Sequence, residues 1–270
     1  MAPSKSKTRP RILRSILENG ASTALAAVLL IAWQAAVPLL GISEFVLPTP
    51  WAIIVRIWSD LALLMRHAYV TGLEVLFGFG IAVIVGVPTG LTIFYSRLFE
   101  KAVYPLLVAL QTIPKVVLAP LLVLYLGYDW APKIFLAFLI SFFPIVIATV
   151  VGLQTLEKAM VNLLRSMGAT EMQTFFKLRL PAALPSIFGG LKLAITFAVT
   201  GAVVGEFIGT DRGLGRLIVV ANGNLDTAGL FAAIVVLTVM AVVLFLVVDV
   251  AERFVVRWHG SQRRFHHGAA

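Results

Sequence analysis

Three polar side chains inside otherwise apolar runs are the residues best suited to act on a solute: Gln111, Lys115 and Glu206. Gln111 lies four residues before Lys115, so on a helix the two side chains would share one face. Ionisable groups are costly among apolar side chains, which makes them candidates for a solute pathway or gate. Lys115 could favour an anionic solute. It could also bond carbonyls that Pro114 leaves free, or pair with Glu74.

Glu206 stands close to the end of its apolar run, in "VVGEFIG". We expect it either to form part of a gate or to pair with Arg212 or Arg216. Lys192 lies in the same run, and we expect its long side chain to reach toward the membrane surface.

No catalytic site stands out in the sequence. There are no cysteines, the four histidines have no metal-ligand spacing, and no Ser-His-Asp or paired-carboxylate arrangement is present. The phosphate-binding pattern G-x-x-x-x-G-K-[ST] is also missing, so we expect no ATP site in this chain. The sequence predicts a protein that is not an enzyme and that has no cofactor of its own.

Composition defines the environment of these residues. The chain has 270 residues, of which 60% are hydrophobic and 13% charged, and its mean hydropathy is +0.97. A soluble domain of this length could not bury several apolar runs of about 20 residues. The sequence therefore predicts an integral membrane protein, and we interpret its net charge of +9 as a topology signal rather than as a sign of nucleic-acid binding.

The apolar pattern predicts an all-α, polytopic protein with six transmembrane helices. The predicted spans are residues 22–40, 69–95, 102–126, 131–153, 186–208 and 230–250. A basic N-terminus (residues 1–21) precedes this membrane domain (22–250), and a basic tail (251–270) follows it. We interpret the first run as an uncleaved helix because it is longer than a signal-peptide core. The third contains Pro105, Pro114 and Pro120, which predict kinks.

The positive charges predict the orientation. Of the 22 Lys and Arg residues, fifteen fall on the side of the two termini and five on the opposite side. By the positive-inside rule, both termini are predicted to be cytoplasmic. The longest internal cytoplasmic segment is then residues 154–185.

That segment contains "NLLRSMGATEMQTFFKLRLPAALP", in which apolar residues recur every three to four positions. The pattern predicts two short amphipathic helices that meet near Gly168 and Ala169. They could lie on the membrane surface, or they could dock a soluble partner, with the small residues allowing close backbone approach.

The same residues resemble the cytoplasmic loop of the inner-membrane permeases of binding-protein-dependent ABC importers. That loop has the pattern Glu-Ala-Ala, three residues, Gly, nine residues, Ile, one residue, Leu-Pro. Here Gly168 precedes Pro181 by thirteen positions, as the pattern requires, and Asn162-Leu163-Leu164 replaces Glu-Ala-Ala. Further segments resemble the nitrate/sulfonate/taurine-type subfamily: residues 46–50, 113–127, 142–153, 180–194 and 203–218.

The resemblance implies a type I importer permease of the bacterial inner membrane, present as a homodimer. Its partners would be a cytoplasmic ATP-binding ABC subunit, which holds the ATP, and a periplasmic or lipid-anchored solute-binding protein. The implied solutes are small anions such as sulfonates, taurine, nitrate or aromatic carboxylates. A pyrimidine vitamin precursor or riboflavin is the alternative solute. The implied ATPase-coupling residues are Leu163, Leu164, Arg165, Ser166, Met167, Gly168, Ala169, Thr170, Leu180 and Pro181.

Two other functions remain compatible with the sequence. One is an ion-coupled secondary transporter, and the other is a membrane-embedded enzyme.

Overall fold

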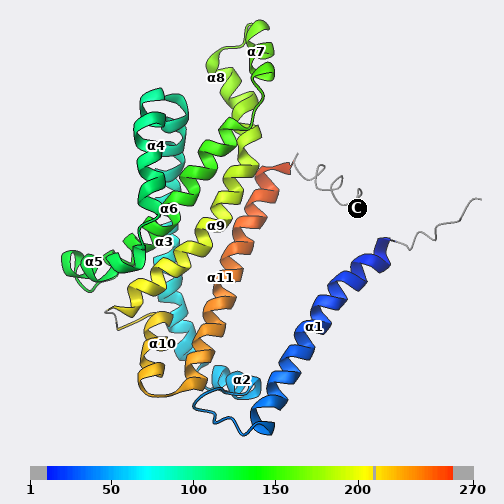
Figure 1. Cartoon of the computed structure of the whole chain (residues 1–270), viewed down its shortest axis with the longest axis vertical. Coiled ribbons are helices and arrows are strands. Elements are labelled where there is room, and N and C mark those ends of the chain that lie inside the picture. Colours follow the sequence, from blue (N-terminus) through cyan, green and yellow to red (C-terminus); the bar gives the residue numbers. More distant parts are fainter. Residues whose placement is uncertain (1–10, 209–210, 258–270) are drawn as a thin grey trace, which may run out of the picture.

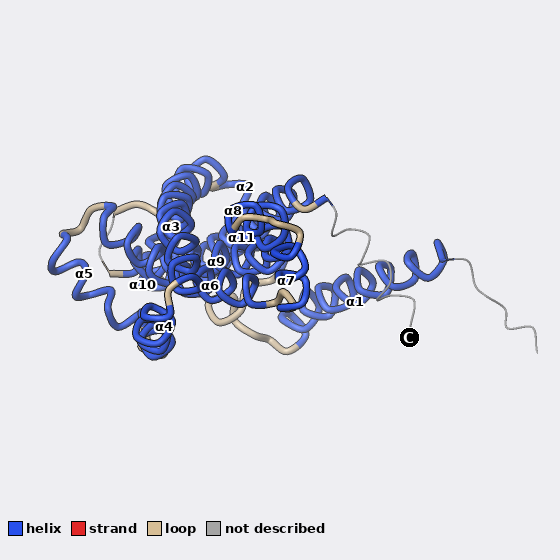
Figure 2. Tube along the Cα trace, turned by 90° about the horizontal axis from the view of Figure 1, so that it is seen from above, coloured by secondary structure: helices blue, strands red, loops and turns tan. Residues whose placement is uncertain are grey.

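The structure is a computed structural model that describes residues 11–208 and 211–257, with side chains from residue 23 onward. Every regular element in these ranges is helical (Figure 2). The prediction of an all-α fold is confirmed.

The elements follow one another with short connections (Figure 1). Their bounds are α1 Arg11–Leu39, α2 Pro50–Ser59, α3 Leu61–Tyr95, α4 Arg97–Gln111, the 3₁₀ turn η1 Lys115–Leu118, α5 Ala119–Leu126, α6 Trp130–Gln154, α7 Lys158–Ser166, α8 Glu171–Thr174, the π turn η2 Phe175–Arg179, α9 Leu180–Phe207, α10 Leu214–Gly223 and α11 Thr227–Val255.

The centre of the bundle is formed by α3, α6 and α9, and its helices approach closely through small residues. On α3, Gly78, Ala82, Gly86 and Gly90 recur every four residues. A Cβ atom on Gly78 would lie 2.5 Å from the Cβ of Ala137 on α6. In lipid, helices associate through such close packing rather than through hydrophobic burial alone. The glycines of the apolar runs therefore position α3 against α6.

Four described helices are long and apolar enough to cross a membrane, and the count rises to five if the bent pair α4 and η1–α5 forms one span. The long helices are α3, the continuous helix Glu171–Phe207, α6 and α11. The predicted span 22–40 falls in the C-terminal part of α1, where side chains are described from Thr23 to Leu39. The six-span count stays a prediction.

The predicted third span, 102–126, is not one kinked helix. The chain bends by 86° between Arg97–Gln111 and Lys115–Leu126. Pro114 precedes η1, and Pro120 lies in the first turn of α5. Proline fits a first helical turn because its missing N–H has no partner to lose there. The prolines therefore end one helix and start another.

The two ends of the bundle carry different elements (Figure 1). The short helices α7 and α8 lie at one end, where α11 also finishes, and α2 and α10 lie at the opposite end. Helix α1 diverges from the bundle. It is joined to α2 by a hydrogen bond from the backbone N–H of Trp51 to Oε1 of Gln34, at 3.0 Å.

Candidate functional site

Helix α7 turns several of its apolar side chains outward, although Val161 is buried on its inner side. Met160, Leu163 and Met167 are 51%, 63% and 77% exposed. The side chains of Lys158, Asn162 and Arg165 share the opposite face with the buried Val161, and this face lies over a cavity. A surface helix of a soluble domain shows the reverse pattern. The outward face is therefore suited to contact lipid or another protein.

The turn after α7 has a defined geometry. The N–H of Gly168 donates to the carbonyl of Arg165 at 2.9 Å, and the N–H of Ala169 donates to the carbonyl of Leu164 at 3.0 Å. Gly168 has φ +82°. These bonds form a Schellman motif, which ends a helix at a left-handed residue and favours glycine there. This accounts for the glycine of the loop pattern.

A second capping structure starts α8 directly after this turn. The Thr170 side chain accepts from the N–H of Gln173 at 3.2 Å, and the Gln173 side chain accepts from the N–H of Thr170 at 2.9 Å. Such a capping box satisfies two donors at a helix start. An ion pair between Arg165 and Glu171 spans the turn. The predicted pair of helices meeting at Gly168 and Ala169 is thus present.

Helix α8 continues without interruption through η2 into α9. Leu180 begins α9, and Pro181 lies within its first turn. The helix therefore starts before residue 186, where the sequence had placed the span. The π turn connects the two pieces, because its five residues shift the hydrogen-bond register without breaking the helix. The coupling-loop candidates Leu163–Thr170 lie together at one end of the bundle, and Leu180 and Pro181 start the span that leads away from it.

Lys115 and Gln111 meet at the break between α4 and η1. The Nζ atom of Lys115 donates to the backbone carbonyl of Gln111 at 2.5 Å and lies 4.8 Å from the centroid of the Phe143 ring on α6. The two residues are in contact only through the main chain of Gln111, and the helix is broken between them, so the expectation of a shared helix face does not apply. Of the two structural roles considered for Lys115, the structure shows the bond to a free carbonyl and not the pairing with Glu74.

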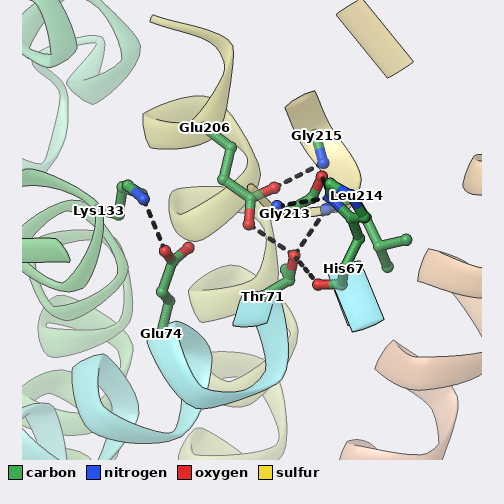
Figure 3. A network of polar contacts seen from close by, with 8 residues as sticks. All are labelled: His67, Thr71, Glu74, Lys133, Glu206, Gly213, Leu214 and Gly215. Carbon is green, nitrogen blue, oxygen red and sulfur yellow. Dashed lines mark hydrogen bonds and ion pairs between the residues drawn. The ribbon is translucent and has the colours of Figure 1, made fainter. Parts of the chain in front are cut away.

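Glu206 is fully buried near the end of α9, and Figure 3 shows its side chain within a network of polar contacts. The Thr71 hydroxyl donates to its Oε1 at 2.6 Å, and the N–H of Gly215 donates to its Oε2 at 2.5 Å. The expected pairing with Arg212 or Arg216 is wrong for this carboxylate, since its partners come from α3 and from the start of α10.

The same network holds the turn before α10 against α3. The N–H of Leu214 donates to the Thr71 hydroxyl at 2.8 Å, and the N–H of Gly213 donates to Nδ1 of His67 at 2.9 Å. Gly213 has φ +115°, and a Cβ atom there would lie 2.1 Å from Oε1 of Glu206. Only glycine fits this close approach. Glu206 therefore joins α3, α9 and α10.

Sequence reasoning missed the partner of Glu74. Its Oε1 lies 2.9 Å from Nζ of Lys133, and the two side chains are 0% and 4% exposed. Lys133 stands near the start of its apolar run, and it is one of the five Lys and Arg residues that the sequence places on the side opposite the termini. The signal that was available is the acidic residue near the start of the predicted second span, because an acidic side chain inside a span favours a buried partner.

The side chain of Lys192 forms ion pairs with α11 and does not reach toward the membrane surface as expected. Its Nζ lies 2.5 Å from Oδ1 of Asp249 and forms a second ion pair with Glu252. Arg253 binds the other oxygen of Asp249 at 2.7 Å. Lys192 is 14% exposed. This cluster connects α9 to the last turns of α11.

These features define an all-helical membrane protein with buried ion pairs between its spans and a structured helical turn at one end, as expected of a multi-pass transport component. The profile of the family described as "Binding-protein-dependent transport system inner membrane component" matches residues 78–259. The chain belongs to this family. It is an ABC importer permease and a multi-pass protein of the bacterial inner membrane.

Relatives match over nearly their whole length. A probable ABC transporter permease protein of Haemophilus influenzae is 34% identical over 91% of this chain and 98% of its own. The formylaminopyrimidine transport permease protein ThiX of Halalkalibacterium halodurans is 34% identical, with 87% and 94% covered. The riboflavin transport system permease protein RibX of Chloroflexus aurantiacus is 38% identical, with 87% and 88% covered. Permeases named for aliphatic sulfonates and for taurine match at 31% and 27% identity.

A solved structure supports the fold. An inward-facing structure of the MetNI methionine ABC transporter contains a chain with a TM-score of 0.61 and 18% sequence identity. The match covers 73% of this chain and 98% of that one. The type I importer permease fold is therefore confirmed. At this identity the likeness concerns the fold alone.

Proposed function

We propose that the turn formed by α7, Gly168 and α8 docks a separate ATP-binding subunit, which supplies the energy for import through this chain. The outward apolar face of α7 carries the proposal, because Leu163 and Met167 are more than half exposed at the tip of the bundle (Figure 1). A groove that buries such a face gains roughly 25 cal/mol for each Å² of apolar area removed from water. This end of the bundle is then the cytoplasmic one.

The connection of this turn to the bundle supports a mechanical role. α8, η2 and α9 form one continuous helix from Glu171 to Phe207, and Glu206 lies at its far end. A push on α7 would therefore be transmitted along α9 to the turn before α10. Packed helices transmit such displacements because interiors are dense and do not deform continuously.

The chain itself has no phosphate-binding loop pattern, which supports a partner as the ATP site. Uptake of solute by cells that carry the complete system should stop on ATP depletion even when the proton gradient is preserved. Persistent uptake would favour an ion-coupled secondary transporter instead.

Substitution of Gly168 by Asp tests the docking role. The Cβ of Gly168 would meet nothing within 4 Å, and Asp is among the residues that tolerate a left-handed conformation, so the fold should survive. The new carboxylate would project from the docking turn, and we expect uptake to fall at least tenfold at unchanged protein abundance.

Two variants control this experiment. Gly168→Asn has the same shape without the charge and should retain more uptake than Gly168→Asp. Gly41→Asp places the same change at another left-handed glycine, with φ +64° and open space around it, and should leave uptake unchanged. Normal uptake by Gly168→Asp would count against docking at this turn.

We further propose that the break at Lys115 and Gln111 lines the solute pathway, and that Glu206 belongs to the gate at the opposite end. Non-helical backbone within a membrane is tolerated where it lines a cavity or is buried in protein. The Nζ of Lys115 is bound to a carbonyl that carries no full charge, so its positive charge stays available to an anion.

Lys115→Met tests this second proposal. The transport rate of an anionic solute such as a sulfonate should fall more than the abundance of the protein in the membrane, because the substitution removes the charge and keeps most of the side-chain length. An equal fall of rate and abundance would show that Lys115 only supports the break.

The residues of this chain do not by themselves define the solute, so the proposal also uses the relatives and the expected solute-binding protein. We propose a small organic or inorganic anion, supported by Lys115 and by the sulfonate and taurine permeases among the relatives. ThiX and RibX support the alternative of a pyrimidine precursor or riboflavin. A second copy of the chain and a solute-binding protein complete the proposed importer, and ligand screening of that binding protein separates the two classes.

A further inference from the structure

A second feature lies on the inner face of α7, opposite the exposed side chains of Met160 and Leu163. A cavity of about 360 Å³ opens between α7, the ends of α3 and α6, and η2. Its volume is within the range of small-ligand sites. Its lining is cationic, because Lys158, Arg165 and Arg179 contribute to it and no acidic residue does.

Arg179 is held in place by aromatic rings. Its guanidinium carbon lies 4.9 Å from the centroid of the Phe94 ring and 6.0 Å from that of Tyr95. Stacking on a ring face leaves the N–H groups at the edge of the guanidinium available for acceptors. Nε of Arg179 is buried without a hydrogen-bond partner in the part of the chain that the structure describes. A buried donor of this kind favours an acceptor supplied by a ligand.

Helix α7 adds complementary groups from the other side. Lys158, Asn162 and Arg165 are three to seven residues apart and line the same cavity. Arg165 is neutralised by its ion pair with Glu171, whereas Lys158 has no ion pair within the described residues. The cavity therefore keeps two positive charges without an ion pair in the described residues, Lys158 and the ring-stacked Arg179.

From these contacts we infer that the cavity binds a phosphate-type anion, either the headgroup of an acidic phospholipid or a free anion from the adjoining solution. Arginine recognises phosphate oxygens with two parallel hydrogen bonds, and lysine adds a compact charge. The site lies where α3 and α6 end and α9 begins, close to the predicted ends of three membrane spans. Cationic pockets between spans at such boundaries are suited to acidic lipid headgroups.

The bound anion would brace α7 from behind. It would join Lys158 of α7 to Arg179 of η2, two parts of the chain that have few other contacts across the cavity. If α7 docks the ATPase, as proposed above, the bound anion would also stabilise the turn at which docking takes place. The inference of binding does not depend on that role, because binding can be measured without the ATPase.

The test is binding to the purified, full-length chain in neutral detergent. Short-chain phosphatidylglycerol is the lipid probe and is followed by native mass spectrometry, with phosphatidylcholine as the reference. Inorganic phosphate is the soluble probe and is followed by calorimetry. The test variant is Lys158→Gln with Arg179→Gln. Its matched control, Lys101→Gln with Lys177→Gln, removes two exposed cations that do not line the cavity.

We expect the test variant to bind the preferred probe at least tenfold more weakly than the control variant, a difference of about 1.4 kcal/mol. The variant Lys158→Gln alone changes an exposed side chain and should weaken binding about threefold, which keeps the test valid if loss of Arg179 disturbs folding. Binding of phosphatidylglycerol but not phosphate identifies a lipid site, and competition by phosphate identifies a free-anion site.

Equal weakening in the control variant would overturn the inference, because it would show non-specific attraction to a basic surface. Failure of the unmodified chain to bind either probe more tightly than phosphatidylcholine would also overturn it. Neither result would affect the docking proposal, which uses the opposite face of α7.

Discussion

Replacement of Lys133 by Met removes the cation from a buried ion pair between α6 and α3. The Nζ–Oε1 distance to Glu74 is 2.9 Å, which gives an attraction of about 6 kcal/mol at an effective dielectric constant of 20. Both charges also pay a desolvation cost, so the net value of the pair is smaller. The experiment measures the loss of folding stability when the ion pair is broken, because the substitution leaves the carboxylate of Glu74 buried without Lys133.

Removal of one partner from a buried pair costs about 3–5 kcal/mol. For a chain of this size, such a loss corresponds to a Tm lower by roughly 6–20 °C. The other interaction of the Glu74 side chain is with the carboxyl group of Glu206, which is not a cation and therefore does not replace the charge of Lys133.

Thermal unfolding of the purified chain in a mild detergent measures this effect, with Lys101→Met on the exposed side of α4 as the matched control. The double variant Lys133→Met with Glu74→Gln should recover at least half of the lost stability, since it removes the isolated charge. A Tm of Lys133→Met within about 2 °C of the control would refute the reasoning. Equal Tm values for the single and double variants would do so as well.

Two further substitutions test the packing of α9. Gly215→Ala should lower the Tm by an amount equivalent to about 1–3 kcal/mol, because its Cβ would lie 2.7 Å from Oε2 of Glu206, whereas Gly223→Ala in the same helix has open space and should not. Lys192→Met should lower the Tm more than Lys177→Met, because it leaves Asp249 and Glu252 buried together. An unchanged Tm in Gly215→Ala or in Lys192→Met would show that the corresponding contact does not stabilise the bundle.

Local signals in the sequence predicted the turn between α7 and α8. Gly168 marks a left-handed residue, and the three- and four-residue spacing of apolar positions marks the helix before it. Both features depend on neighbouring residues only, so they could be read without knowledge of the fold. The inward cationic face of α7 was not predicted, because the cavity that it covers is formed by residues far apart in the chain.

Interactions across the bundle could not be predicted in the same way. Three acidic residues and three lysines within the predicted spans allow several pairings, and the choice depends on how the helices are aligned with one another. The close contacts of α3 with α6 place Lys133 beside Glu74, and Lys115 instead remains at the break of its own span. The size of that bend also depends on the surrounding helices, since prolines predict a kink but not its angle.

The measurement that tests the central claim most directly is affinity purification of the chain from its native membrane, with mass spectrometry of the proteins that come with it. We predict that the unmodified chain and the Gly41→Asp variant retain an ABC-type ATPase and that Gly168→Asp loses it. Retention of the ATPase by Gly168→Asp in the same amount as by the other two would contradict docking at the turn between α7 and α8.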